Sequence, residues 1–129
     1  MRQTMPHLFL VMLGGAIGAG LRHLVGLATL RVLGPGFPWG TLAVNLAGGL
    51  AMGLLAGWLV RDGGSDSARL FLGVGILGGF TTFSAFSLEV GLMLQRGELG
   101  VAAAYIAASV IGSVALLFAS LWLMRGVPA

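Results

Sequence analysis

The chain has 129 residues, of which 57% are hydrophobic and 9% are charged, with a mean hydropathy of +1.01. A soluble domain of this size would be about a quarter charged, so the composition predicts an integral membrane protein without a separate soluble domain. The net charge of +3 arises from seven arginines against four acidic residues, and the arginines are scattered and form no basic stripe for nucleic acid. The lack of cysteine excludes disulfides and thiolate-based sites.

Four segments are long and apolar enough to cross a bilayer, which takes about 20 residues of helix. They cover residues 7–30, 39–60, 70–94 and 99–124, and they predict an all-α, single four-helix transmembrane domain over residues 1–129. The first segment also starts like a secretory signal peptide, with Arg2 ahead of a short apolar core. Because apolar character resumes after Arg22, we interpret this segment as a span.

Loops of helix-breaking or polar composition separate the spans. Gly34-Pro35-Gly36 precedes the second span, and the most polar stretch, residues 61–69, precedes the third. Four spans put both termini on one side of the membrane. The six arginines other than Arg22 are split four to two between the sides, which is a weak orientation signal. Charge alone therefore permits insertion in both orientations, and an antiparallel dimer, as readily as one fixed topology.

Small residues recur four positions apart in the first two spans, the spacing at which helices approach closely in lipid. They are the pairs Gly14 with Gly18 and Ala16 with Gly20, and the stripe Gly49, Gly53 and Gly57. Asn45 lies one turn before this stripe, so we expect it to face protein rather than lipid.

The third span contains the most unusual stretch, residues 78–87, in which two glycines precede four hydroxyl residues interleaved with phenylalanines. Each glycine is roughly 1 kcal/mol worse than alanine inside a helix. Irregular backbone at membrane depth persists only when it is buried in protein or lines a watery path. We expect a broken helix whose carbonyls, freed between Gly78 and Thr82, suit a hard cation such as Na⁺. A second chain crossing at its own break would complete the shell; a plain kink tightened by water is the alternative.

Phe83 and Phe86 share a helix face with these hydroxyls, which makes the face too polar for lipid. A phenyl ring has a positive edge, and two edges directed into a narrow, dry path would attract a small anion weakly enough for it to leave again. The alternative is that both rings are ordinary core or lipid-facing aromatics.

Polar side chains on the other spans extend this candidate path. Asn45 can donate to an anion through its amide or form an interhelical hydrogen bond. Tyr105, Ser109 and Ser113 follow each other at intervals of four and form a hydroxyl track, although helical serines often bond their own i−4 carbonyl.

Arg22 is the one cation well inside a span, where it either draws anions into a vestibule or extends to the interface. Glu89 lies one turn beyond Phe86 and can pair with an arginine, relay protons or bind hydroxyls. The sequence lacks nucleophile-elbow, P-loop, paired-carboxylate and zinc signatures, so we do not expect an enzyme.

Three blocks of this sequence resemble the Fluc (CrcB-type) fluoride channels. They are Gly18-Ala19-Gly20-Leu21-Arg22, Trp39-Gly40-Thr41-Leu42-Ala43-Val44-Asn45-Leu46-Ala47-Gly48, and Gly78-Gly79-Phe80-Thr81-Thr82-Phe83-Ser84 with Phe86. The third block is highly specific, and the three in order cover essentially the whole chain. The sequence departs from the family pattern at His23, Phe80 and Ala85, the last of which removes one possible donor.

The resemblance implies a dual-topology antiparallel homodimer with two pores in the inner membrane, passively exporting fluoride and so reducing its toxicity. It implies a pore lined by Phe83, Phe86, Asn45, Thr82, Ser84, Tyr105, Ser109 and Ser113. It further implies Arg22 in an electropositive vestibule and a structural Na⁺ held by the carbonyls of Gly78 and Thr81 from both chains.

Two other functions stay open. A proton-coupled small multidrug exporter also has four spans, but it needs a carboxylate in the first span, where this chain has Arg22 and no acid. A non-transporting scaffold would explain the glycine stripes and leave the hydroxyl–aromatic break unexplained.

Overall fold

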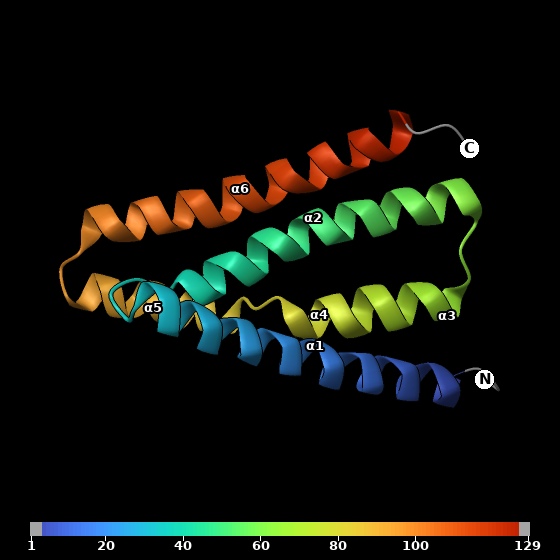
Figure 1. The fold of residues 1–129 in the computed structure, drawn as a ribbon, viewed down its shortest axis with the longest axis horizontal. Helices are drawn as coiled ribbons and strands as arrows, with labels where there is room; N and C mark the ends of the chain where they lie inside the picture. The colour runs from blue at the N-terminus through green and yellow to red at the C-terminus, as the bar shows by residue number, and fades with distance from the viewer. Residues whose placement is uncertain (1–3, 127–129) are drawn as a thin grey trace.

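The computed structural model describes residues 4–126, and every regular element in this range is helical (Figure 1). The elements are α1 (Thr4–Leu33), α2 (Trp39–Asp62), α3 (Asp66–Ala68), the π-helix η1 (Arg69–Leu77), α4 (Gly78–Phe80), α5 (Ser84–Gln95) and α6 (Leu99–Gly126). α3, η1, α4 and α5 together form the third span. Within the described range, four helices are long and apolar enough to cross a membrane, which confirms the predicted architecture.

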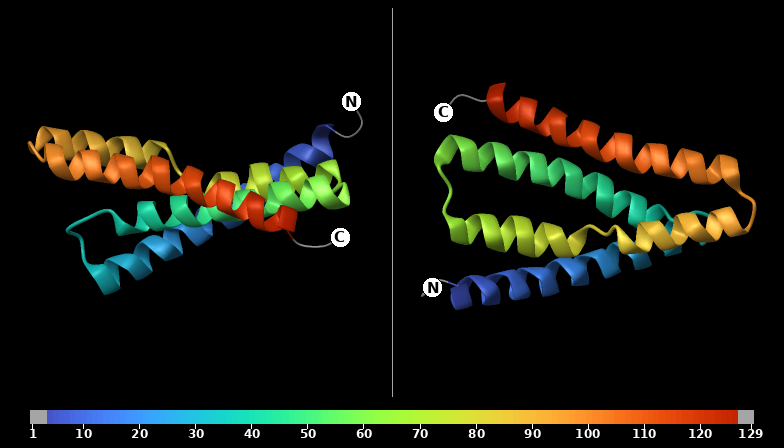
Figure 2. Two further views of the ribbon diagram at one scale, coloured as in Figure 1. Left: turned by 90° about the horizontal axis from the view of Figure 1, so that it is seen from above. Right: turned by 180° about the vertical axis from the view of Figure 1, so that it is seen from behind.

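The third span changes neighbours along its length. Its first part, η1 and α4, packs on α1, whereas α5 packs on α6, and α2 lies along α6. Both described chain ends lie at the same end of the molecule, as four spans require (Figure 1). Seen from above, α5 and the start of α6 diverge from the end of α1 and the start of α2 (Figure 2).

Glycines allow the helices to approach backbone to backbone. A Cβ on Gly14 would lie 2.6 Å from the Phe71 carbonyl oxygen, and one on Gly49 would lie 2.6 Å from the Ser113 carbonyl oxygen. The predicted stripe in α2 therefore packs on α6, and the Gly14–Gly18 pair packs on the third span. A Cβ on Gly20 would meet nothing within 4 Å, so this second predicted pair makes no close contact at Gly20.

The buried core is small, as expected for a protein whose outer surface faces lipid. Its main cluster comprises Phe86, Met93, Ala102 and Tyr105, with Phe37, Leu42 and Val90 packed against it. Large apolar side chains are exposed along all four spans of the isolated chain.

The break lies later than the glycine pair indicated. The helix continues through Gly78 and Gly79 and is interrupted at residues 81–83, before α5 begins at Ser84. Gly79 serves packing, because a Cβ there would lie 2.5 Å from the Gly15 carbonyl oxygen. The interruption comes where the Asn45 side chain of α2 bonds the Thr82 backbone in place of helical partners.

Candidate functional site

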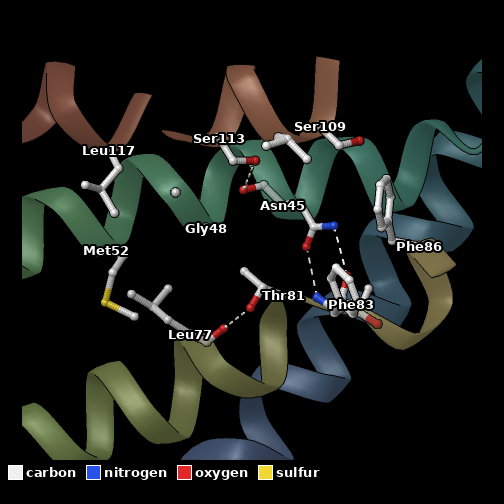
Figure 3. Close-up of a pocket in the computed structure, with 13 residues that line it drawn as sticks. Asn45, Gly48, Met52, Leu77, Thr81, Phe83, Phe86, Ser109, Ser113 and Leu117 are labelled. Carbon is white, nitrogen blue, oxygen red and sulfur yellow. Dashed lines mark hydrogen bonds between the residues drawn. The ribbon is translucent and has the colours of Figure 1, made fainter. Parts of the chain in front are cut away.

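A cavity of about 360 Å³ opens where the break faces α2 and α6 (Figure 3). Its lining residues are Asn45, Gly48, Gly49, Met52, Leu77, Thr81, Thr82, Phe83, Phe86, Ser109, Val110, Ser113 and Leu117. The lining contains no charged side chain. The cavity therefore offers an ion hydroxyl, amide and ring-edge groups instead of a full counter-charge.

Asn45 binds the break at both its amide atoms. Its Nδ2 donates to the Thr82 carbonyl at 3.0 Å, and its Oδ1 accepts from the Thr82 N–H at 2.9 Å. The side chain thus replaces two backbone partners that a continuous helix would supply. Asn45 therefore forms the interhelical hydrogen bonds predicted as one of its two possible roles, through its Oδ1 and one Nδ2 hydrogen. The second Nδ2 hydrogen stays available for another acceptor, such as an anion.

The break leaves specific carbonyls without their helical donors. The Thr82 N–H donates to Asn45 rather than to the Gly78 carbonyl four residues earlier, and the Ala85 N–H donates to Thr82 Oγ1 rather than to the Thr81 carbonyl. Between them, the Gly79 carbonyl accepts from Arg22 Nε at 3.1 Å. The side chains that hold the break open thereby free Gly78 and Thr81, the two carbonyls that the family resemblance implies as cation ligands.

The two phenylalanines follow the break and form a tilted pair. Their ring centroids lie 5.8 Å apart at 45°. Phe86 is buried at 8% exposure, whereas Phe83 is 77% exposed, so one ring closes the cavity and the other points out of the isolated chain.

The hydroxyl track on α6 divides into members with different partners. Ser113 Oγ donates to the Asn45 carbonyl at 3.2 Å. Ser109 is 6% exposed, and its Oγ has no hydrogen-bond partner within the described residues. A buried hydroxyl without a partner carries the desolvation cost of a polar group, which a bound ion or water would offset.

Tyr105 and Ser84, also predicted for the path, lie outside the cavity lining. Tyr105 is completely buried, and its hydroxyl donates to Glu89 Oε2. Ser84 Oγ lies 3.5 Å from Thr82 Oγ1 at the start of α5. The structure thus brings six of the eight predicted path residues around the cavity and separates these two from it.

Arg22 is absent from the lining of this cavity. It lines a second cavity with His23, Gly40, Thr41 and others, and Thr82 lines both cavities. Thr82 and its partner Asn45 therefore separate an arginine-lined space from the neutral cavity.

The sequence predicts hydroxyl groups as one possible kind of partner for Glu89 but does not identify Thr41. Thr41 Oγ1 donates to Glu89 Oε1 at 2.7 Å across 48 positions of sequence. A carboxylate inside a span signals that a partner exists, but no spacing rule points to a threonine on another helix.

Comparison with known proteins matches residues 9–121 to a family described as CrcB-like protein, Camphor Resistance (CrcB). A protein of Sphingopyxis alaskensis named fluoride-specific ion channel FluC is 56% identical over 97% of this chain and 100% of its own length. Proteins of the same name from Novosphingobium aromaticivorans and Hyphomonas neptunium are 58% and 61% identical, covering 91% and 90% of this chain and 94% and 93% of their own lengths.

Proposed function

The chain belongs to the CrcB-like protein family. From this membership and the geometry of the cavity we propose that it is a fluoride-specific passive ion channel. It is a multi-pass protein of the inner membrane and not an enzyme. Its task would be to release cytoplasmic fluoride and so limit its toxicity.

The single observation that carries this proposal is the unpartnered, buried Ser109 hydroxyl in an uncharged cavity beside Phe83 and Phe86. A fluoride ion loses its hydration shell only if other donors replace it. Ser109 Oγ–H, the second amide hydrogen of Asn45 and the positive ring edges supply such donors without a full positive charge. Binding would then be strong enough for entry and weak enough for exit.

Two features support an antiparallel homodimer with two pores. Phe83 is 77% exposed in the isolated chain although it lines the cavity, and a second copy packed over it would enclose this side of the path. Each break also presents too few freed carbonyls to surround a hard cation from one chain alone. Two chains related by a two-fold axis and crossing at their breaks would supply both missing parts.

A structural Na⁺ would be held at this crossing by the carbonyls of Gly78 and Thr81 from both chains. The donor set fits a hard cation, because the helical donors of these two carbonyls bond elsewhere. Na⁺ there would offset the repulsion between the partly negative carbonyl oxygens that the two chains bring together. Arg22 would have two functions: it would fix the break and make the second cavity an electropositive vestibule.

The test is halide efflux from liposomes containing the purified protein, with K⁺ and valinomycin as the electrical shunt. We expect rapid loss of fluoride, negligible loss of chloride and no need for a proton gradient. Absence of fluoride efflux from folded protein would contradict the proposal. Efflux that requires a proton gradient would point instead to the proton-coupled exporter.

A further inference from the structure

Glu89 is an acidic side chain close to a path proposed for anions, and fluoride conduction as outlined does not use it. It is half-buried within α5, one helical turn beyond Phe86. Ionisable groups at such depth are costly and mark functional positions. A carboxylate near an anion path also repels the anion, so its presence requires a specific reason.

Both carboxylate oxygens accept hydrogen bonds from hydroxyl groups of other helices. Thr41 Oγ1 donates to Oε1 at 2.7 Å, and the Tyr105 hydroxyl donates to Oε2 at 2.5 Å. These are the short distances of charge-assisted bonds. Arg96 shares a surface cavity with Glu89 but forms its ion pair with Glu98, at 2.9 Å. Among the described residues, the carboxylate of Glu89 therefore accepts hydrogen bonds from two hydroxyls instead of forming a salt bridge with Arg96.

The Tyr105 hydroxyl that Glu89 holds belongs to the ring that supports the pore phenylalanines. The Tyr105 ring centroid lies 5.1 Å from that of Phe86 and, edge-on, 5.2 Å from that of Phe37. Phe86 in turn packs on Phe83 at 5.8 Å. A rotation of Tyr105 would displace Phe86, because Tyr105 is completely buried and packs in one cluster with Phe86.

The same carboxylate joins two arms of the molecule. α5 and the start of α6 diverge from the start of α2 (Figure 2), and Thr41 lies at the start of α2, on the other arm from Glu89 and Tyr105. The Thr41 bond thus fixes the phenylalanine-bearing arm relative to the arm that carries Asn45.

We propose that Glu89 is a positioning residue, whose carboxylate anchors Tyr105 and Thr41 and thereby fixes the Phe86 ring edge in the path. This rests on the proposed fluoride conduction at Phe83 and Phe86. Because its hydroxyl is bonded to Glu89, Tyr105 supports the path through its ring and does not donate to the ion. Glu89 itself neither carries protons nor binds the ion.

The chain contains a single tyrosine, so 3-fluorotyrosine labelling gives one ¹⁹F resonance that reports on Tyr105 alone. The variant is Glu89→Gln, which keeps the side-chain shape and removes the charge. The matched control is Glu98→Gln, which makes the same change at a partly exposed ion pair beyond α5. Glu89→Asp keeps the charge with shorter reach, and it replaces Glu89→Gln if that variant does not fold.

We expect the ¹⁹F resonance of Tyr105 to shift or broaden in Glu89→Gln and to stay in place in Glu98→Gln. Fluoride efflux should fall about tenfold in Glu89→Gln, the scale of one lost charge-assisted hydrogen bond. Tyr105→Phe should lower efflux similarly, and the double variant should fall little further. The pH profile of efflux should keep its shape in Glu89→Gln.

Reduced efflux with an unchanged ¹⁹F resonance would overturn the proposal, because Glu89 would then act through its charge on the ion. A pH dependence present in the wild type and lost in Glu89→Gln would also overturn it, because Glu89 would then carry protons. If the wild type conducts no fluoride, the conduction proposal fails, while the ¹⁹F comparison still decides whether Glu89 holds Tyr105.

Discussion

The Asn45→Asp variant tests two proposed roles of Asn45, which are to hold the break open and to let an anion pass along the cavity. Asparagine donates from Nδ2 to the Thr82 carbonyl at 3.0 Å and accepts the Thr82 N–H at 2.9 Å. Aspartate keeps the acceptor and replaces the donor with a second oxygen. In Asn45→Asp the carboxylate and the Thr82 carbonyl then face each other as two acceptors.

The size of the effect follows from these two contacts. Leaving a buried carbonyl without its donor costs about 1–3 kcal/mol, so we expect the unfolding free energy of the purified protein to fall within this range. A negative charge in the cavity lining also repels fluoride. Two unit charges 4 Å apart at an effective dielectric constant of about 20 interact by roughly 4 kcal/mol, so fluoride efflux should fall by at least a factor of a hundred.

The assay compares Asn45→Asp with Gln95→Glu, which makes the same amide-to-acid change at an exposed position at the end of α5. Fluoride efflux from liposomes and chemical unfolding in detergent are measured for both. The control should retain wild-type values in both measurements. Wild-type efflux from folded Asn45→Asp at neutral pH would refute the reasoning, because an ion passing Asn45 would then experience neither the charge nor the lost donor.

Phe83→Ala or Phe86→Ala should nearly abolish fluoride efflux while leaving dimer assembly on gel filtration intact; wild-type flux from both would remove the ring-edge role. Gly53→Leu should prevent α2 from packing on α6 and lower the yield of folded protein, because a Cβ there overlaps Ser120, whereas Gly20→Ala, which meets open space, should purify normally. Arg22→Gln should reduce efflux and destabilise the protein by about 1–3 kcal/mol, because the Gly79 carbonyl loses its donor. An unchanged denaturation midpoint in urea would show that this bond is unimportant. Exchanging Na⁺ for N-methylglucamine during thermal denaturation should lower the melting temperature of the dimer; an identical melting curve would argue against a structural cation.

The four spans were predictable from sequence because lipid demands long apolar helices, and this demand is local. The glycine stripe of α2 was predictable for the same reason, since close helix packing needs small residues at fixed spacing. The position of the break was only approximate. Two glycines weaken a helix, but the interruption falls at residues 81–83, where Asn45 binds Thr82, and a contact between residues 37 positions apart has no local signature.

The candidate site shows the same limit. Of the three α6 residues predicted from their spacing of four, Ser109 and Ser113 line the cavity and Tyr105 does not. Which of these hydroxyls is occupied depends on partners from other helices: Ser113 bonds the Asn45 carbonyl, Tyr105 bonds Glu89, and Ser109 has no partner in the described residues. The periodicity of one helix does not contain this information.

The break is held by side chains from helices that precede it in the chain, Arg22 on α1 and Asn45 on α2. Synthesis proceeds from the N-terminus, so both partners are already made when residues 81–83 leave the ribosome. An interrupted helix entering lipid alone would expose bare peptide groups, which hydrocarbon does not tolerate. The order of the helices therefore has a biosynthetic meaning: a permuted gene that encodes the third span first should yield a chain that inserts poorly, although its final contacts would be the same.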